Sequence, residues 1–230
     1  MPSFNIIKKS SLERTFRTDS VIGQFDLQID NEVQEQFTGN IAIEGIDWKV
    51  GLIVGSSGSG KTTIAKELFQ DFYTNDKEYN GNAVIDNMPS GLSVQQITAM
   101  FNTVGFATVW SWLKPYHVLS NGEKMRVDLA HALLSESDTI VFDEFTSVVD
   151  RTVAKSASYA IGKAVRKSDK KFVAVACHRD IADWLEPDWI YDTDEQRFFF
   201  AMERSNDPKC NLRFANVQPK YGNFLGSITI

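Results

Sequence analysis

A loop of small residues, GSSGSGKTT at positions 55–63, constrains the fold of this chain more than any other stretch. It fits the pattern G-x-x-x-x-G-K-[ST], with Gly55, Gly60, Lys61 and Thr62 at the fixed positions. An apolar run at residues 51–54 predicts a buried parallel strand before the loop, and apolar residues at helical spacing predict a helix over about residues 60–73. This order of strand, glycine loop and helix indicates a phosphate-binding loop, because a flexible surface turn would explain neither Lys61 nor the flanking elements.

The residue types of this loop suit a nucleoside triphosphate. Glycines permit backbone conformations in which successive N–H groups converge on an anion, and the start of a helix adds further donors. We expect Lys61 to reach the β- and γ-phosphates and the Thr62 hydroxyl to ligate Mg²⁺. The predicted nucleotide-binding residues of the loop are Gly55, Ser56, Ser57, Gly58, Ser59, Gly60, Lys61, Thr62 and Thr63.

Composition narrows the class of protein. The hydrophobic fraction of 43% is enough for a sizeable core, and the net charge of −6 gives no support to a broad nucleic-acid surface. The two cysteines, Cys177 and Cys210, make no disulfide framework. The N-terminus lacks a secretion signal, and no uninterrupted apolar run is long enough to span a membrane. We therefore expect a cytoplasmic protein that does not insert directly into a membrane.

The remaining pattern predicts an α/β fold with a mainly parallel sheet, since strands alternate with helices. Three short N-terminal strands, which would form an antiparallel β subdomain, are expected at residues 4–7, 21–29 and 41–43. Further strands are expected at residues 83–85, 139–142 and 172–176, and a hairpin at residues 190–200. Helices are expected at residues 93–104, 119–134 and 152–167.

Two of the predicted strands end in residues suited to phosphoryl transfer. The strand at 139–142 is followed by Asp143 and Glu144, and the strand at 172–176 is followed closely by His178. The carboxyl ends of parallel strands meet at one edge of a sheet, so these side chains should face the phosphate loop. Asp143 is suited to hold Mg²⁺ through water, Glu144 to orient or deprotonate the attacking water, and His178 to sense the γ-phosphate.

The order of five segments resembles that of the ATP-binding-cassette (ABC) ATPase family. They are GSSGSGKT, LSNGEKMR, TIVFDE, SVVD and the lone His178, and the resemblance covers roughly residues 20–195. It implies a P-loop NTPase of ABC type over residues 1–205, with ATP and Mg²⁺ as cofactors and a shortened helical subdomain at about residues 90–134. Residues 206–230 would be a C-terminal tail that could dock another protein or close the chain's own sheet as a strand.

The resemblance also implies a composite site, because two copies in this family pack head to tail with ATP between them. The Ser120 hydroxyl and the Gly122 N–H of one copy would contact the γ-phosphate held by the other, and Asp150 would link the two sites. ATP would hold the two copies together as a homodimer, and its hydrolysis by Glu144 would let them separate. The catalytic residues that the resemblance predicts are Glu144, His178 and Lys61.

Several positions depart from the family pattern. The usual glutamine is not evident between the loop and the LSNGE segment, where Asp86, Gln95 and Gln96 are the candidates for its place. The adenine-stacking aromatic is Phe25 or Phe37, either of which would serve equally as a core residue. Asn121 and Glu123 replace a glycine and a glutamine, and glutamate at that position is similar to soluble DNA-repair ATPases.

These departures favour an ABC ATPase of the soluble, non-transporter kind. Residues 173–192, with DEFTSVVDR, are similar to soluble ABC ATPases fused to an acetyltransferase-like domain. The favoured function is therefore an ATP-gated dimer that drives a soluble partner, either acetyltransferase-like or processing nucleic acid. The alternatives are the ATPase subunit of a membrane transporter and an assembly module that binds ATP without hydrolysing it.

Overall fold

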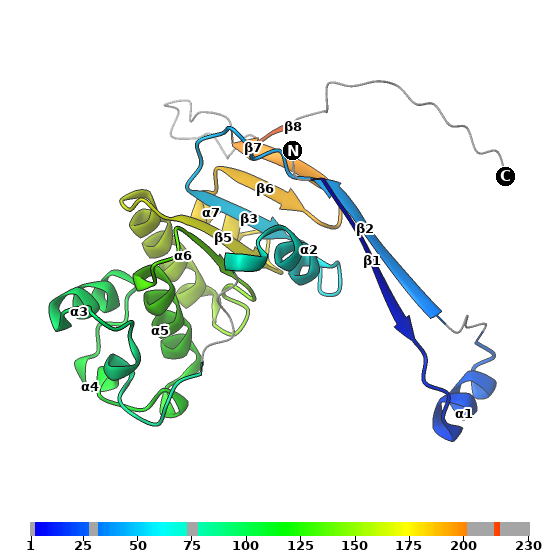
Figure 1. Cartoon of the computed structure of the whole chain (residues 1–230), viewed down its shortest axis with the longest axis horizontal. Helices are drawn as coiled ribbons and strands as arrows, with labels where there is room; N and C mark the ends of the chain where they lie inside the picture. The colour runs from blue at the N-terminus through cyan, green and yellow to red at the C-terminus, as the bar shows by residue number, and fades with distance from the viewer. Residues whose placement is uncertain (1–2, 28–31, 73–77, 202–213, 217–230) are drawn as a thin grey trace.

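A six-stranded mixed sheet forms the centre of the computed structural model, which describes residues 3–27, 32–72, 78–201 and 214–216. The strand order is β4-β5-β3-β6-β7-β8 (Figure 1). The strands are β3 (Val50–Val54), β4 (Thr139–Phe142), β5 (Lys171–Ala176), β6 (Trp189–Asp192), β7 (Arg197–Ala201) and β8 (Phe214–Asn216). The first four of these run parallel, and β7 and β8 add an antiparallel edge. The predicted α/β fold with a mainly parallel sheet is confirmed.

Each face of the sheet has its own hydrophobic core, because alternate residues of a strand point to opposite faces. On one face, Leu52 of β3 belongs to a cluster with residues of α5 (Asn121–Leu134), α6 (Arg151–Arg166) and α7 (Ile181–Leu185). On the other face, Ile53 belongs to a cluster with residues of α2 (Lys61–Leu68) and the fully buried Trp189. The buried strands hold the phosphate loop between these two cores.

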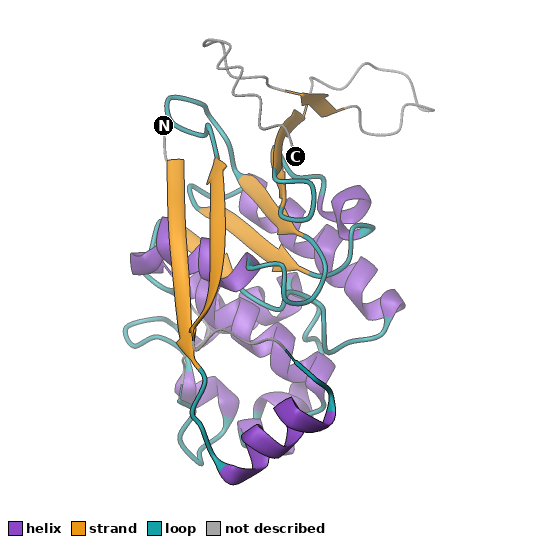
Figure 2. Ribbon diagram, turned by 90° about the vertical axis from the view of Figure 1, so that its right-hand side faces the viewer, coloured by secondary structure: helices purple, strands orange, loops and turns teal. Residues whose placement is uncertain are grey.

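The N-terminal antiparallel subdomain is a long hairpin of β1 (Ser3–Ser11) and β2 (Glu32–Asn40). Its two strands run side by side in Figure 2, and α1 (Phe16–Gln24) lies at its far end in Figure 1. The strand predicted at residues 21–29 is therefore wrong over its described part. Thr15 and Thr18 form a reciprocal capping box that starts a helix, and this local bonding overrides the apolar alternation that suggested a strand.

Two other predicted strands are also wrong. Ile41 is fully buried, but the Ile43 N–H donates to its carbonyl oxygen at 2.9 Å, so the chain turns at residues 41–43 instead of pairing with a neighbour. Ala83 makes only an isolated bridge to Pro115, after which the chain enters the 3₁₀ turn η2 (Val84–Asn87). The Asn87 side chain donates to the Ala83 carbonyl oxygen at 2.9 Å and closes this turn.

The predicted helices are found with small shifts at their ends. A small helical subdomain contains α3 (Val94–Thr103), α4 (Val109–Trp112), the 3₁₀ turn η3 (Tyr116–Val118) and the start of α5. Ser93 and Gln96 form the predicted capping box of α3, although Val94, expected on its apolar face, is exposed. The helix after the phosphate loop is shorter than predicted, ending at Leu68, and a 3₁₀ turn η1 (Gln70–Phe72) follows it.

The predicted hairpin at residues 190–200 is formed by β6 and β7. Part of the predicted tail, β8, pairs with β7, which agrees with the alternative of a strand that closes the sheet. The apolar residues at the end of the tail, Phe224, Leu225, Ile228 and Ile230, lie outside the described residues. Within the described ranges, no helix has both the length and the apolar character needed to cross a membrane.

Candidate functional site

Four neighbouring parallel strands end at the same edge of the sheet, where the predicted site residues follow them. Val54 of β3 pairs with Ala176 of β5 and with Asp192 of β6, and Phe142 of β4 pairs with Ala174. The phosphate loop, Asp143 with Glu144, and His178 therefore leave the sheet at one edge. This is the edge at which open α/β sheets bind ligands.

The phosphate loop fits tightly against its neighbours. Gly60 lies in the left-handed region with φ of 84°, and α2 begins at the next residue. A Cβ atom at Gly60 would lie 2.2 Å from the Phe37 ring, and one at Gly55 would lie 2.0 Å from the Thr193 hydroxyl oxygen. Glycine is thus required at both positions by space, and at Gly60 also by backbone conformation. Of the two candidate adenine-stacking aromatics, Phe37 packs on the phosphate loop, whereas Phe25 caps the end of α1 and is exposed.

The cation of the loop is held inside it. Lys61 is buried, and its Nζ donates to the Ser56 carbonyl oxygen at 2.6 Å. The Ser59 hydroxyl donates to the same oxygen at 2.8 Å. These bonds keep the ammonium group against the loop backbone, where the predicted phosphate-binding N–H groups lie.

The two predicted Mg²⁺ ligands are in direct contact, although 81 residues separate them in sequence. The Thr62 hydroxyl donates to Asp143 Oδ2 at 2.8 Å, and Asp143 Oδ1 accepts from the Glu144 N–H at 2.8 Å. Asp143 is only 7% exposed. A hydroxyl and a buried carboxylate are oxygen donors of the kind that Mg²⁺ takes beside a bound phosphate, so these residues fit the ion.

Glu144 is exposed, and its backbone has a left-handed conformation with φ of 52°. The next residue, Phe145, is fully buried, and its N–H donates to the Val175 carbonyl oxygen at 2.8 Å. This anchor fixes the turn after β4 and explains how a non-glycine residue is kept in a left-handed conformation. Glu144 and Asp143 line a pocket of about 300 Å³, which is walled on another side by Asn121 of α5.

An aromatic pair, Tyr79 and Tyr116, also lines this pocket. The rings of Tyr79 and Tyr116 stack with centroids 3.9 Å apart, and both hydroxyls donate to the Asp128 carboxylate at 2.7 Å. Burial raises the pKa of both tyrosines, and the neighbouring Asp128 carboxylate raises it further. The two phenols therefore stay protonated and fasten Tyr79 and η3 to Asp128 of α5. Asp86, one candidate for the position of the family's glutamine, is exposed in η2 and does not line this pocket.

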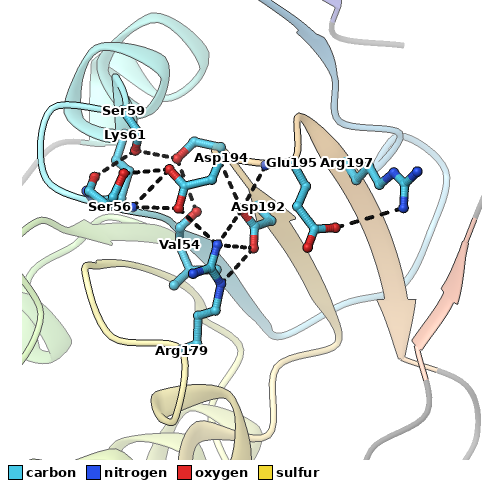
Figure 3. Close-up of polar contacts among 10 residues, drawn as sticks. Val54, Ser56, Ser59, Lys61, Arg179, Asp192, Asp194, Glu195 and Arg197 are labelled. Atoms are coloured by element: carbon cyan, nitrogen blue, oxygen red, sulfur yellow. Dashed lines mark hydrogen bonds and ion pairs between the residues drawn. The ribbon is translucent and has the colours of Figure 1, made fainter.

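His178 follows β5 and is exposed, whereas the residue after it makes an ordered set of contacts. Arg179 forms hydrogen bonds with Asp192 and Asp194, which follow each other closely at the end of β6 (Figure 3). The Asp194 carboxylate in turn accepts from the N–H and the hydroxyl of Ser56. The hydrogen bond from the Ser56 hydroxyl is the main cause of a lowered pKa at Asp194, and Arg179 contributes to the same shift.

Ser120, predicted to act on the nucleotide of a second copy, begins α5. Its hydroxyl accepts from the Glu123 N–H and donates to Glu123 Oε2 at 2.8 Å, in a capping box. Glu123 Oε1 accepts from the buried Ser111 hydroxyl at 2.6 Å. This last hydrogen bond, together with those from Ser120, lowers the pKa of Glu123. Asp150 has a similar position at the start of α6, where its carboxylate accepts from the N–H groups of Thr152 and Val153.

Comparison with known proteins places this geometry in a fold family. No protein-family model matches the chain. The lactococcin-G-processing and transport ATP-binding protein LagD of Lactococcus lactis subsp. lactis is 28% identical over 172 residues, which cover 56% of this chain and 24% of that protein. A probable metal transport system ATP-binding protein of Thermotoga maritima is 28% identical over 149 residues, covering 55% of this chain and 62% of that protein. The dimeric structure of a bacterial ABC transporter cassette matches with a TM-score of 0.55 and 14% identity, covering 81% of this chain and 94% of that one.

The chain has the fold of an ABC-type ATPase. The match extends over less than two thirds of the length of either curated relative. Both relatives are ATP-binding proteins of transport systems by name. The comparisons therefore support the ABC ATPase family but give no support to the narrower resemblance to acetyltransferase-linked, soluble members. The roles of the individual site residues stay predictions.

Sequence reasoning missed the residues that brace this ABC-type site. Arg179 adjoins His178, and Asp192 and Asp194 lie within the predicted hairpin at residues 190–200, so each belonged to or adjoined a recognised feature. Nothing local indicated their contact, because it joins segments whose spatial proximity depends on the strand order. That order, with β3 between β5 and β6, cannot be predicted from any local sequence pattern.

Proposed function

We propose that the chain binds MgATP at the edge of its sheet, hydrolyses it within a dimer of two copies, and serves as the ATP-binding subunit of a membrane transporter. The observation that carries the ATPase part is the contact between Thr62 and Asp143. It joins the end of the phosphate loop to the end of β4, where Lys61 and Glu144 adjoin the two residues in sequence, and so supports the proposal that Thr62 and Asp143 hold Mg²⁺ together. The transporter part is supported by the transport-system relatives.

Each residue has a distinct task in this proposal. The loop N–H groups and Lys61 would hold the β- and γ-phosphates, because converging donors and a buried cation stabilise concentrated negative charge. Thr62 and Asp143 would hold Mg²⁺, which neutralises charge that develops on the transferred phosphoryl group. Glu144, exposed at the rim of the pocket, would orient the attacking water and accept its proton. His178 would donate a hydrogen bond to the γ-phosphate from the neighbouring strand end.

A second copy would supply the other half of the site. Ser120 is exposed at the start of α5, and a helix N-terminus favours a bound anion. Among the described residues, and apart from its chain neighbours and its own helix backbone, a Cβ atom at Gly122 would meet nothing closer than Arg126 Nη1 at 3.7 Å and a Val153 methyl carbon at 3.7 Å. Packing within the chain therefore does not require glycine there, which is consistent with a close approach by something outside the chain. In this dimer the bound ATP would act as an adhesive that hydrolysis removes.

Replacing the proposed base tests this function. Glu144→Gln keeps the size of the side chain but cannot accept a proton, so it should abolish phosphate release while leaving an ATP-bound dimer. Phosphate release and light scattering measure the two effects. Glu136→Gln, at an exposed glutamate in the loop before β4, is the matched control and should behave like wild type. A wild-type protein with no Mg²⁺-dependent phosphate release, even with its partner present, would reject hydrolysis and leave the alternative of a non-hydrolysing assembly module.

The nature of the partner needs a separate experiment. The missing glutamine and the shortened helical subdomain favour the alternative of a soluble partner, either acetyltransferase-like or processing nucleic acid. Affinity purification from detergent-solubilised cells with the Glu144→Gln variant should stabilise whichever complex forms. A co-purifying integral membrane protein is the expected result. Recovery of soluble partners alone would reject the transporter assignment and leave the ATPase assignment intact.

A further inference from the structure

We infer that Arg179 is a positioning residue that fixes the His178 segment to the phosphate loop through the Asp194 carboxylate. This inference rests on the proposed ATP site. The link consists of three segments: the start of the loop after β5, the end of β6 with the turn that follows it, and the first half of the phosphate loop, in which Ser56 lies 138 positions from Asp194 in sequence. Figure 3 shows the side chains of these segments converging.

The first contact in the link joins Arg179 to the turn after β6. Its Nε donates to Asp192 Oδ2 at 3.0 Å, and its Nη2 donates to Asp192 Oδ1 at 3.1 Å, so the guanidinium group engages this carboxylate with two parallel bonds. The same Nη2 donates to Asp194 Oδ2 at 2.9 Å. Two parallel bonds fix the orientation of a planar guanidinium, which a lysine could not reproduce. Asp192 is only 6% exposed and is anchored in β6, so the fork has a rigid base.

The second contact joins this turn to the phosphate loop. Asp194 accepts from the Ser56 N–H at 2.9 Å and from the Ser56 hydroxyl at 2.7 Å. The Ser56 carbonyl oxygen, on the other side of the same residue, is the acceptor for the Lys61 ammonium group at 2.6 Å. Thr193 adds a contact of 2.6 Å between its hydroxyl and that of Ser59. The turn after β6 thus braces the loop at the residue that also orients its cation.

The other side of the His178 segment is tied to α6. Asp180 pairs with Arg151, whose guanidinium lies 4.8 Å from the ring centre of Trp184. Arg151 is the first residue of α6 and directly follows Asp150, which was predicted to link the two sites of a dimer. His178 therefore precedes two consecutive residues of opposite charge, one connected to the phosphate loop and the other to the Asp150 turn. A displacement of either partner would be transmitted to the histidine through these contacts.

Charge gives a second reason for Arg179 to matter. Two carboxylates accept hydrogen bonds from the same nitrogen, Arg179 Nη2: Asp192 Oδ1 at 3.1 Å and Asp194 Oδ2 at 2.9 Å. Arg179 is the cation that bridges them. Without it, two negative charges would face each other beside a loop that must bind a polyanion, and Asp194 would be a weaker anchor for Ser56. Loss of Arg179 should therefore weaken nucleotide binding as well as displace His178.

A charge-matched pair of arginine variants tests this link. Arg179→Gln removes the bridging cation, and Arg197→Gln removes an equally exposed arginine at the start of β7, which lies 3.9 Å from Glu195. Binding of fluorescent MgATP and MgADP analogues to the full chain should weaken about tenfold or more in Arg179→Gln and remain at the wild-type value in Arg197→Gln. Because the brace acts on the part of the loop common to both nucleotides, ATP and ADP should lose affinity by similar factors. Arg179→Lys should bind both nucleotides more tightly than Arg179→Gln but less tightly than wild type, because lysine keeps the positive charge but cannot form the two parallel hydrogen bonds.

A double-mutant cycle separates this link from a general structural role. Asp194→Asn should weaken nucleotide binding on its own. The double variant Arg179→Gln/Asp194→Asn should have the same nucleotide affinity as whichever single variant binds less tightly, because both changes break the same link. Additive losses, or a lowered melting temperature with unchanged nucleotide affinity, would overturn the inference. If Arg179→Gln does not fold, Arg179→Lys and Asp194→Asn carry the same cycle. A wild-type chain that binds neither nucleotide would reject the proposed function instead, so the two failures are distinguishable.

Discussion

Replacing Glu123 with alanine should destabilise the fold by an amount that the contacts of its carboxylate define. The carboxylate accepts three hydrogen bonds: from the Ser111 hydroxyl at 2.6 Å, the Ser120 N–H at 3.0 Å and the Ser120 hydroxyl at 2.8 Å. The family-like segment has a glutamate here in place of the usual glutamine, so this residue also tests what the departure does. Alanine keeps the helix-forming tendency of the position while removing all three acceptors.

The expected loss has two parts. Ser111 is 2% exposed, so its hydroxyl would be left buried without this partner, at a cost of about 1–3 kcal/mol. Loss of the capping box at the start of α5 adds about 0.5–2 kcal/mol. The free energy of unfolding should therefore fall by about 1.5–5 kcal/mol. In a chain of this length each kcal/mol lowers the melting temperature by about 2–4 °C, so we expect a shift of about 3–20 °C.

The charge of the carboxylate gives this shift a predictable pH dependence. The hydrogen bond from Ser111 and those from Ser120 lower the pKa of Glu123 in the folded state. Its ionic contribution to stability is complete above the unfolded-state pKa of about 4.3 and is lost as the pH falls through the lower folded-state value. The difference in melting temperature between wild type and Glu123→Ala should therefore be constant near neutral pH and narrow in acid below about pH 4.3.

Thermal unfolding followed by circular dichroism between pH 7 and acid checks both the size and the sign. Glu67→Ala, at an exposed glutamate on α2, is the control for losing one negative charge from a helix and should unfold like wild type. A Glu123→Ala variant with an unchanged melting temperature would refute the reasoning from the hydrogen bonds. A gap that widens as the pH falls would refute the assignment of the stabilisation to the ionised form.

Four further predictions concern the nucleotide site and the core. Lys61→Ala removes the buried cation of the phosphate loop and should abolish binding of a fluorescent ATP analogue; normal binding would refute its role. Thr62→Val should make nucleotide binding independent of added Mg²⁺, as titration with and without the ion would show, and an unchanged Mg²⁺ requirement would count against this ligand. Ser120→Arg should leave ATP binding by the monomer intact and prevent dimerisation, measured by light scattering; a dimer that forms normally would contradict the composite site. Gly51→Val should lower the melting temperature by about 2–12 °C, because a Cβ atom there would lie 2.1 Å from the buried Trp189 ring and overpacking costs about 1–3 kcal/mol; an unchanged value would show that the ring can move aside.

The edge of the sheet that carries the candidate site was predictable because its signals are local. Gly60, Lys61 and Thr62 follow an apolar run, and Asp143 and Glu144 follow another, so each motif identifies its own strand. Parallel strands end at one edge, and this general rule was enough to expect that Thr62 and Asp143 lie near each other. The structure adds the distance between them and the burial of the carboxylate.

The N-terminal strands were less predictable because competing local bonds decide them. Residues near Val21 alternate in hydropathy, but Thr15 and Thr18 satisfy each other's backbone groups and begin a helix instead. Ile41 has the apolar character of a strand residue, yet it fills the core beside β3 while its carbonyl oxygen bonds within a turn. In each case the side chain has the hydrophobic character that the pattern indicated, but the backbone hydrogen bonds form within a helix or a turn and not between strands.

The contacts of Arg179 could not be predicted from local sequence at all, because they depend on the order of strands in the sheet. Because β3 lies between β5 and β6, the loops that follow these three strands are neighbours at the same edge. Asp194 can then accept hydrogen bonds from both Arg179 and Ser56, and one carboxylate joins the histidine segment to the phosphate loop. If His178 contacts the γ-phosphate as proposed, its link to the phosphate loop would let the two segments respond together to ATP. In the proposed dimer that response would reach the second copy through the Asp150 turn, because Asp180 and Arg151 connect it to the same segment.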